Sequence, residues 1–489
     1  MSATPDHLLR AAFDPDTFRG DGERLLARLA DHLERGLQAD NGAVLPWREP
    51  SRMLDRWRAD FDTGASALPG VHAGMSPSAV LDVLSMHMLD DATQLHHPGF
   101  VGHQVAPSLP LAALCDFAAA FTNNGMAVYE MGQQGTAMEL HVVDWMAKQL
   151  GLGSAAGGVL TSGGTLATLT ALLAMRQARA GWDVWTDGSI GGPPPAVLVS
   201  EQAHYCADRA VRIMGWGEGG LIRVPVDDTY RMRTDLLPEY LARAQQAGRR
   251  VLGVIGSACS TATGSFDPLV PIADFCAAHD LWMHVDGAHG AALALSGKYA
   301  DRLDGIGRAD SVIWDAHKML LQPALVTAVL FKDARHSAGA FAQDASYLLG
   351  PRGEAAWYDL AGRTFECTKR MMSFKLYATL AAYGPALFDA YVTRTVDLAH
   401  DFAALLRAQP DFEVAVEPQA NIVCFRHLPA GVADLDAHQA AVRMRIITRG
   451  MFYPVQTMLR GTRWLRTSLM HPFTSRDDLQ RLLDEVRTA

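Results

Sequence analysis

The sequence predicts an α/β fold, with a mostly parallel sheet in a large domain and a smaller α+β domain after it. Between residues 96 and 370, short apolar runs alternate with longer segments of helical periodicity, which is the pattern of β-α-β units. Polar and titratable residues stand directly after several of these runs, where a parallel sheet gathers its ligand-binding groups. At 489 residues without a low-complexity linker, the chain is also too long for one minimal core.

Residues 1–95 are predicted to form an N-terminal helical segment rather than an independent domain. In "FDPDTFRGDGERLLARLADHLERGL" (13–37), apolar residues recur at helical spacing with charged residues between them. This pattern predicts an amphipathic helix that needs a partner surface. The remainder mixes Pro, Gly and short helical patterns, so we expect the segment to pack on another surface.

The large domain, residues 96–370, contains six predicted strands, which are 196–200, 221–227, 251–259, 281–286, 311–314 and 326–331. Helical periodicity falls between several of them, as in 165–180 and 269–280. The smaller domain, residues 371–489, is indicated by a strand-like "NIVCFRH" (421–427) and a closing helix, "SRDDLQRLLDEVRTA" (475–489).

The composition argues for a globular protein of the cytoplasm. Hydrophobic residues make up 49% and charged residues 20% of the chain, and the net charge of -10 comes without a basic block, which argues against nucleic acid as a partner. We expect no membrane segment, because no apolar run reaches the length of a span. The six cysteines have no spacing typical of zinc, so we expect no metal site.

Four places in the large domain carry residues suited to chemistry. "TSGGT" before a long helix could hold an anion, although Gly-rich helix caps are common. His204 starts another helix and, taken singly, is more readily a cap or surface residue. Asp286 follows a wholly apolar strand, where a carboxylate needs a cationic partner. Lys318 follows "SVIWDAH"; burial favours the neutral amine, which is the nucleophile that condenses with an aldehyde.

Pyridoxal phosphate is the cofactor that would use all four features together. It needs a lysine for its covalent attachment, a carboxylate to keep its pyridine nitrogen protonated, an anion cradle for its phosphate, and flat or small groups against its ring. The joint occurrence of these residues in one β-α-β array is far more specific than any of them alone.

With these residues in view, the sequence resembles the pyridoxal-phosphate-dependent group II amino-acid decarboxylases, which act on glutamate, cysteine sulfinate, aromatic amino acids or 2,4-diaminobutyrate. The resemblance runs from about residue 97 to the end. It is carried by "HPGFVGHQ", "TNNGMAVYEMGQQGTAMELHVVDWM", "TSGGTLATL", "SEQAHYCADRA", "HVDGAHG", "ADSVIWDAHKMLLQP" and, more weakly, "ECTKRMMSFKLY". It implies fold type I and a homodimer with its active site at the subunit interface, with the N-terminal segment wrapped over the partner.

The resemblance also implies roles for residues around the cofactor. Lys318 matches the lysine that bonds to the cofactor, and Asp286 matches the carboxylate paired with the pyridine nitrogen. His204 matches the imidazole stacked on one ring face, and Ala288 packs a methyl group on the other. His317 matches a histidine that helps to hold the phosphate end.

Further positions follow from the same resemblance. Gly164 and Thr165 fall at the phosphate cradle, Asp315 lies at its edge, and Thr261 matches a threonine near the cofactor's polar edge. Tyr358 is the nearest candidate for the tyrosine that donates a proton to Cα, although a plain loop residue is an equal reading.

The substrate is less clear than the cofactor. His103 and Gln104 fall in the segment that lines the substrate pocket, while Arg466 could meet an anionic substrate group but is more readily a solvated or structural arginine. Glutamate-type members usually read "NPHK" where this chain has "DAHK", which moves the expectation away from a simple glutamate decarboxylase. The predicted reaction is decarboxylation of an L-amino acid to its amine; the alternatives are oxidative deamination to an aldehyde after decarboxylation, and amine transfer.

Overall fold

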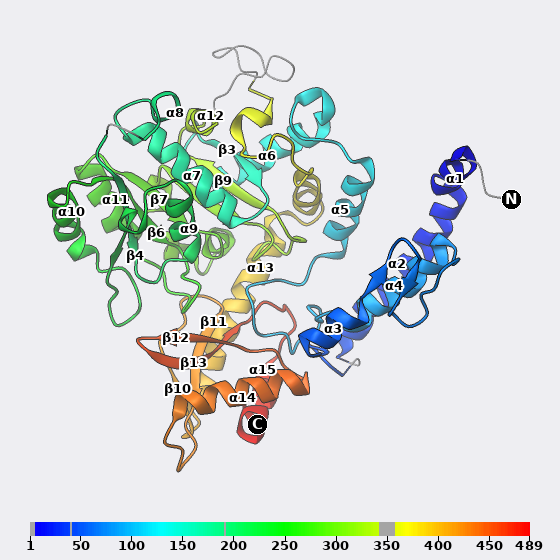
Figure 1. Cartoon of the computed structure of the whole chain (residues 1–489). Helices are drawn as coiled ribbons and strands as arrows, with labels where there is room; N and C mark the ends of the chain where they lie inside the picture. Colours follow the sequence, from blue (N-terminus) through cyan, green and yellow to red (C-terminus); the bar gives the residue numbers. More distant parts are fainter. Residues whose placement is uncertain (1–4, 40–41, 190–191, 342–356) are drawn as a thin grey trace. The chain divides into compact units, whose positions relative to one another are not determined.

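The computed structural model describes residues 5–39, 42–189, 192–341 and 357–489, which fall into two compact units (Figure 1). The first unit comprises 1–102, 434–455 and 473–489, and the second comprises 103–433 and 456–472. The predicted division into 1–95, 96–370 and 371–489 stays a prediction, because compactness alone divides the chain in another way.

The second unit is built on a seven-stranded sheet. In spatial order its strands are β3 (Gly157–Thr161), β9 (Thr327–Phe331), β8 (Ser311–Asp315), β7 (Trp282–Asp286), β6 (Arg250–Ser257), β4 (Pro195–Ser200) and β5 (Leu221–Val224). The strands β5, β4, β6, β7 and β8 run parallel, whereas β9 is antiparallel to both of its neighbours, β8 and β3. The carboxyl ends of β3, β4, β6, β7 and β8 therefore meet at one edge of the sheet.

Helices cover both faces of this sheet (Figure 1). Successive residues of a buried strand point to opposite faces, so Val312 and Ile313 of β8 enter two separate hydrophobic clusters. The Val312 cluster includes residues of α6 (Gln133–Gln149), α10 (Leu237–Gln246) and α11 (Leu269–Ala278), and the Ile313 cluster includes residues of α7 (Gly164–Arg179) and α9 (Tyr205–Ile213).

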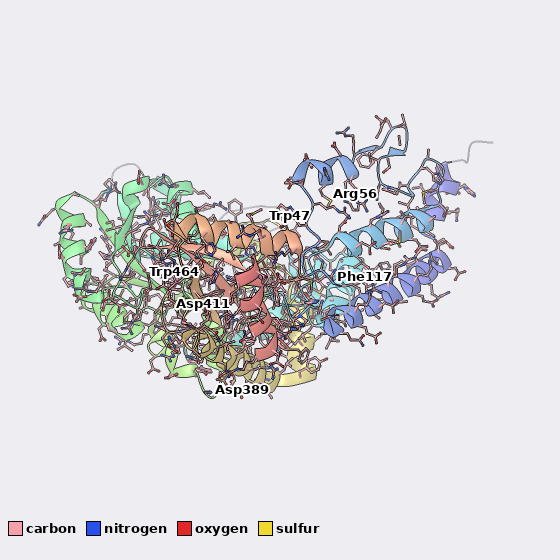
Figure 2. All side chains as sticks on the ribbon, turned by 90° about the horizontal axis from the view of Figure 1, so that it is seen from below. Trp47, Arg56, Phe117, Asp389, Asp411 and Trp464 are labelled. Carbon is pink, nitrogen blue, oxygen red and sulfur yellow. The ribbon has the colours of Figure 1, made fainter. Side chains whose placement is uncertain are left out.

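The second unit also holds a smaller antiparallel sheet and further helices. The sheet has the order β10 (Phe412–Val414), β11 (Ile422–His427), β13 (Thr462–Ser468) and β12 (Val455–Leu459). The further helices are α5 (Pro110–Thr122), α8 (Val184–Asp187), α12 (Arg335–Gly339) and α13 (Ser373–Arg407). The long α13 is broken at Gly384, where φ is 63°, directly before Pro385. The Asp389 side chain on α13 (Figure 2) accepts a hydrogen bond from the backbone N–H of Gly297 at 3.1 Å.

The first unit is mainly helical. It contains α1 (Pro5–Ala12), α2 (Pro15–Gln38), α3 (Pro50–Arg56), α4 (Pro77–Asp91), α14 (Leu435–Arg449) and α15 (Arg476–Thr488), with short strands β1 (Ala59–Asp60) and β2 (Ala65–Ser66). Arg28 on α2 pairs with Asp82 on α4 at 2.7 Å, and Arg56 (Figure 2) pairs with Asp91 at 3.0 Å. These ion pairs tie the N-terminal helices together.

The predicted α/β architecture is confirmed, and most of the predicted elements are present. The exceptions have local causes: the 221–227 run ends as a strand at Val224 because Pro225 cannot donate to the ladder, and the short edge strand β3 was not predicted. None of the helices in the described ranges is long and apolar enough to cross a membrane.

Candidate active site

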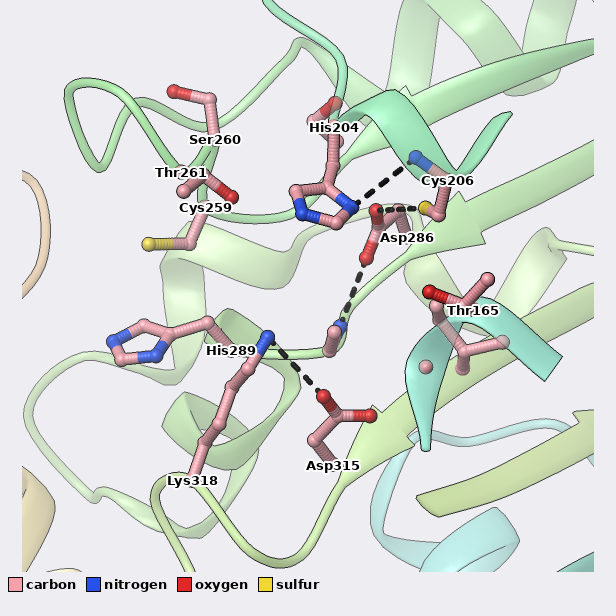
Figure 3. Close-up of a pocket in the computed structure, with 14 residues that line it drawn as sticks. Thr165, His204, Cys206, Cys259, Ser260, Thr261, Asp286, His289, Asp315 and Lys318 are labelled. Atoms are coloured by element: carbon pink, nitrogen blue, oxygen red, sulfur yellow. Dashed lines mark hydrogen bonds and ion pairs between the residues drawn. The ribbon is translucent and has the colours of Figure 1, made fainter. Parts of the chain in front are cut away.

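A pocket of about 220 Å³ lies where the parallel strands of the large sheet end. Figure 3 shows most of the side chains that line it, which come from β6, β7 and β8 and from the segments directly after β3, β4, β6, β7 and β8. The lining residues are Gly164, Thr165, His204, Cys206, Ser257, Cys259, Ser260, Thr261, Asp286, Ala288, His289, Ile313, Asp315 and Lys318. Eight predicted site residues are therefore brought together: Gly164, Thr165, His204, Thr261, Asp286, Ala288, Asp315 and Lys318.

Lys318 lies in the loop between β8 and β9, with its Nζ atom 3.1 Å from Asp315 Oδ2. The hydroxyl of Thr327 donates to Asp315 Oδ1 at 2.6 Å and fixes that carboxylate. Burial alone would lower the pKa of Lys318, but Asp315 and Asp286 outweigh it and hold the pKa above its ordinary value. The expectation that this lysine loses its charge through burial is therefore wrong for the protein without cofactor, because two carboxylates stabilise the ammonium.

Asp286 ends β7 and is held by two donors. Its Oδ1 accepts the backbone N–H of Ala288 at 3.2 Å, and the Cys206 thiol donates to its Oδ2 at 3.9 Å. Burial raises the pKa of Cys206 to about 12, so the thiol keeps the proton that it donates to this carboxylate. These contacts aim the carboxylate into the pocket.

His204 is the N-cap of α9 and faces the same pocket as Asp286 (Figure 3). Its Nδ1 accepts a hydrogen bond from the backbone N–H of Cys206 at 3.3 Å, so a neutral ring carries its proton on Nε2. Burial lowers the pKa of His204, although Asp286 acts in the opposite direction. The side chain is therefore a flat neutral ring beside a carboxylate, as stacking on a cofactor requires.

The turn before α7 forms an anion cradle. Gly163 has a φ of 113°, which a side chain would strain, and no side chain caps the first turn of the 16-residue helix. A Cβ atom on Gly164 would lie 3.2 Å from Asp315 Oδ1, so the glycine keeps the approach to the helix N-terminus open. Backbone N–H groups and the helix dipole are thus available to a phosphate at this end of the pocket.

Four predicted site residues are not among those lining this pocket. The Nδ1 atom of His317 lies 2.9 Å from the carbonyl oxygen of Val326, and Tyr358 packs on the ring of Tyr129 at 5.3 Å between centroids. His103 is exposed, and Gln104 contacts β13 instead. The structure leaves the roles predicted for them as predictions.

Arg466 on β13 is buried, with 6% of its surface exposed, and donates to Gln104 Oε1 at 3.1 Å. Of the two readings of Arg466 as a solvated or a structural arginine, burial excludes the solvated one. Burial lowers the pKa of this guanidinium, and within the described residues neither its Nε nor the Nε2 of Gln104 has a hydrogen-bond partner. Two unused donors thus lie side by side in the second unit.

The sequence interpretation missed the other six lining residues, namely Cys206, Ser257, Cys259, Ser260, His289 and Ile313. His289 and Cys206 stand two or three residues from Asp286 and His204, so proximity to a strand end was the available signal. Nothing in the local sequence indicated Cys259, whose side chain depends on an unusual backbone conformation.

The residues present fit pyridoxal phosphate. The pocket offers a primary amine, a carboxylate held by two donors, a flat imidazole, the methyl group of Ala288 and an uncapped helix N-terminus. Each of these matches one chemical part of the cofactor, namely its aldehyde, its ring nitrogen, its two ring faces and its phosphate.

Residues 86–428 match the family model described as the pyridoxal-dependent decarboxylase conserved domain. The chain is 29% identical over 459 residues to an L-2,4-diaminobutyrate decarboxylase of Acinetobacter baumannii, covering 91% of this chain and 90% of the relative. It is 28% identical over 422 residues to an aromatic-L-amino-acid decarboxylase of Bacillus atrophaeus, covering 85% of each.

Solved structures share the fold. The glutamate decarboxylase domain of a diaminobutyrate-pyruvate transaminase and L-2,4-diaminobutyrate decarboxylase from Vibrio parahaemolyticus superposes with a TM-score of 0.80 at 25% identity, covering 95% of each chain. The structure of Oryza sativa TDC with PLP and tryptamine gives a TM-score of 0.85 at 22% identity, covering all of this chain and 99% of the other. The expected fold type I is thereby confirmed.

Proposed function

The chain belongs to the pyridoxal-dependent decarboxylase family, and from that premise we propose that the pocket around Lys318, Asp286 and His204 is the active site in which it decarboxylates an L-amino acid. The chain is a lyase that uses pyridoxal phosphate to form an amine. The observation that carries the assignment of the site is the meeting of an amine, two carboxylates and a neutral imidazole at the ends of neighbouring strands.

Bound pyridoxal phosphate supplies a ring that withdraws the electrons left at Cα when carbon dioxide departs. Asp286 would support this by holding a proton on the ring nitrogen, since its carboxylate lines the pocket and is oriented by two donors. His204 and Ala288 keep the ring flat between them. Gly164 and Thr165 receive the phosphate at the N-terminus of α7, which fixes the cofactor's position relative to Lys318.

Lys318 would hold the cofactor through its amine. Asp315 lies 3.1 Å from Nζ and can hold the free ammonium close to the pocket. We infer from this contact that Asp315 supports Lys318. In the same proposal His317 supports the phosphate end through the loop that carries Lys318, and Thr261 lies at the cofactor's polar edge.

The proton that replaces carbon dioxide on Cα is assigned to Tyr358. Its ring is about one-third exposed and lies against Tyr129 rather than among the residues lining the pocket of its own chain. This role therefore requires the site of a second subunit, which ties the assignment of the proton donor to the oligomeric state.

The substrate's anionic group is assigned to Arg466 and Gln104, with His103 directly before Gln104 in the sequence. The guanidinium and the amide each present an unused donor, and paired donors suit a carboxylate. Arg466 also acts electrostatically on Cys259 and His289, which line the pocket. This proximity supports a contact between Arg466 and a substrate bound in the pocket.

We propose that the protein is a homodimer. On α5, Leu114, Phe117 and Phe121 recur at helical spacing, and each is about half exposed or more. A row of large apolar side chains on one helix face is typical of a surface that a second protein covers. In the first unit, α2 likewise leaves Leu26 and Leu29 exposed, which supports the expectation that this segment packs on a partner.

The dimer is tested by the molar mass in solution. The variant Phe117→Glu/Phe121→Glu is expected to sediment as a monomer at concentrations where the wild type is a dimer. Val270→Glu, at an exposed apolar position of α11, serves as the matched control and is expected to stay dimeric. A monomeric wild type would contradict the proposal. We also propose a cytoplasmic location, which the six unbridged cysteines support.

The reaction is tested by incubating the purified protein and pyridoxal phosphate with acidic, basic and aromatic L-amino acids, and measuring carbon dioxide and amine. Equal amounts of both are expected from at least one substrate, with none from Lys318→Ala. Release of peroxide and aldehyde would instead identify the oxidative alternative, and a keto acid without carbon dioxide would identify amine transfer. No turnover of any amino acid would contradict the proposed function.

A further inference from the structure

Cys259 has a backbone conformation that is unusual for its residue type. Its φ is +77°, in the left-handed region that favours glycine, and it follows β6 at the edge where the site lies. The residues on either side are fixed: the N–H of Ala258 donates to the carbonyl of Asp286 at 2.8 Å, and the N–H of Ser260 donates to the carbonyl of Ser265 at 2.8 Å. The fold therefore imposes this conformation on a residue that carries a side chain.

The conformation places the Cys259 side chain in the pocket. Figure 3 shows its sulfur on the side of His289 and away from Thr165, that is, away from the anion cradle. Gly290 packs closely here, because a Cβ on this glycine would lie 2.5 Å from the carbonyl oxygen of Ala258, 2.7 Å from the ring of Phe266 and 2.8 Å from the Cβ of Cys259. A strained side chain and a closely packed glycine thus occur together next to the site.

The chemistry of Cys259 points to shape rather than reactivity. Burial raises the pKa of its thiol to about 12, although Arg466 and Lys318 act in the opposite direction. A thiol that keeps its proton is a poor nucleophile. The Cys259 side chain therefore limits the space in the pocket, close enough to Arg466 and Lys318 to feel their charges.

His289 lines the pocket together with Cys259, and its hydrogen bonds indicate that a ligand extends past Cys259. The Nδ2 of Asn421 donates to the carbonyl of Leu469 at 3.0 Å, which leaves its Oδ1 to accept from Nε2 of His289 at 2.7 Å. The neutral His289 ring then carries a lone pair on Nδ1. This atom is buried and has no hydrogen-bond partner among the described residues, so a donor group of a bound molecule would satisfy it.

We propose that Cys259 is a specificity-determining residue, whose side chain limits the length of the substrate side chain on the side of the pocket that His289 lines. This inference rests on the proposed function, since it assumes that an amino acid occupies that space. It predicts a substrate with a short side chain ending in an N–H or O–H donor for His289. Replacing Cys259 by glycine removes both the side chain and the backbone strain.

The test compares the wild type with Cys259→Ala and Cys259→Gly on L-2,3-diaminopropionate, L-2,4-diaminobutyrate, L-ornithine and L-lysine. These substrates end in the same donor and differ by one methylene at each step. In Cys259→Gly, the ratio of kcat/KM for a longer over a shorter substrate is expected to rise about tenfold for a methylene, with a smaller rise in Cys259→Ala. An unchanged ratio in both variants would overturn the proposal.

Two further readouts do not depend on turnover. The affinity of the Cys259→Ala and Cys259→Gly apoproteins for pyridoxal phosphate is expected to stay within about twofold of the wild type. A loss of cofactor affinity that accompanies the change in substrate preference would place Cys259 against the cofactor and overturn the proposal. The unfolding midpoint of Cys259→Gly is expected at or above that of Cys259→Ala. The control is Cys276 in α11, where the helical backbone puts the glycine variant below the alanine variant.

The same midpoints separate this inference from the proposed function. If Cys259→Gly unfolds below Cys259→Ala, as at Cys276, the strain that directs the side chain is absent and the inference fails. If the wild type decarboxylates no amino acid, the proposed function fails, and the binding of the corresponding diamines to the holoenzyme still reports whether the glycine variant accepts a longer chain.

Discussion

Asp315 Oδ2 lies 3.1 Å from Lys318 Nζ, so the amine at the centre of the site faces a carboxylate from the strand directly before it. Burial lowers the pKa of Lys318, but Asp315 and Asp286 raise it further and leave the ammonium favoured. Attachment of the cofactor needs the neutral amine, which is more abundant as the pH rises through the pKa.

Asp315→Asn is therefore expected to lower the pKa of Lys318 and move the pH profile of cofactor attachment to lower pH by about 1 unit or more. The rate is measured by mixing apoprotein with pyridoxal phosphate at a series of pH values and following the absorbance of the bound cofactor. Asp333→Asn, which removes a surface carboxylate paired with Arg335, is the control and should leave the profile in place. Superimposable profiles for Asp315→Asn and wild type would refute the role of this carboxylate.

Two buried histidines make the protein sensitive to acid. Burial lowers the pKa of His284 to about 4 and that of His289 to about 3, from an ordinary value of 6.5. Below pH 6.5 the unfolded chain binds protons that the folded protein does not, so stability is full above this pH and is lost as the pH falls toward 4. Each histidine is expected to remove about 3 kcal/mol from the free energy of unfolding over this range.

Denaturant titrations of the apoprotein between pH 7 and pH 4 measure this loss. His289→Gln removes one titrating group, so its stability should fall less steeply with decreasing pH than that of the wild type. His7→Gln, on the exposed surface of α1, should follow the wild type. Equal slopes for His289→Gln and wild type would show that this histidine is not held neutral by folding.

Glu139 and Lys369 form a buried ion pair beside the edge strand β3. Glu139 Oε1 accepts the N–H of Leu160 at 2.9 Å, and Lys369 Nζ donates to the carbonyl of Leu160 at 2.6 Å. Lys369→Met leaves a buried carboxylate without its partner and is expected to lower the free energy of unfolding by about 3–5 kcal/mol. Lys148→Met, which breaks the exposed pair with Asp144, should change it by less than about 1 kcal/mol. Comparable decreases in the free energy of unfolding for Lys369→Met and Lys148→Met would contradict the expectation that the buried pair matters more.

Mixed dimers test whether Tyr358 acts in the partner's site. Lys318→Ala and Tyr358→Phe chains are each expected to be inactive in amine formation. After they are unfolded together and refolded, half of the dimers carry one chain of each kind and one complete site, so about a quarter of the wild-type activity should return. Pairing Lys318→Ala with the double variant should return none. Failure of the first mixture to recover activity would place Tyr358 outside the shared site.

Arg466→Met tests the assignment of the substrate's anionic group. Loss of a buried donor to a carboxylate is expected to reduce kcat/KM about a hundredfold or more, mainly through KM, for the preferred amino acid. The affinity for pyridoxal phosphate should stay unchanged, because the site proposed for the cofactor's phosphate is the N-terminus of α7. A reduced affinity for the cofactor with an unaltered KM would reassign Arg466 to the cofactor.

The sequence predicted the positions at strand ends well, and the reason is geometric. Asp286 and Lys318 each follow an apolar run, and parallel strands bring such residues to one edge whatever the details of packing. The position of Cys259 could not be predicted in this way, because its side chain depends on a backbone angle set by hydrogen bonds to Asp286 and Ser265. His289 lies three residues after Asp286, but the orientation of its ring depends on a hydrogen bond to Asn421, 132 residues away.

The strand β3 and the burial of Arg466 likewise depend on contacts that are distant in the sequence. The strand β3 is only five residues long and starts with two glycines, so its pairing with β9 outweighs its weak intrinsic preference. The burial of Arg466 was missed because its partner, Gln104, comes from a segment 362 residues earlier in the chain. Local pattern carries no information about contacts at that separation.

The antiparallel direction of β9 limits how the attachment point of the cofactor can move. Lys318 lies in a loop whose two ends, Asp315 and Thr327, pair across neighbouring strands, and the N–H of Ala316 donates to the carbonyl of Val326 at 3.0 Å just inside that closure. These contacts hold the two ends of the loop together. In the proposed reaction, any movement of the lysine amine would therefore come from rotation about its own four-carbon stem, because the backbone at both ends of the loop is held by these contacts.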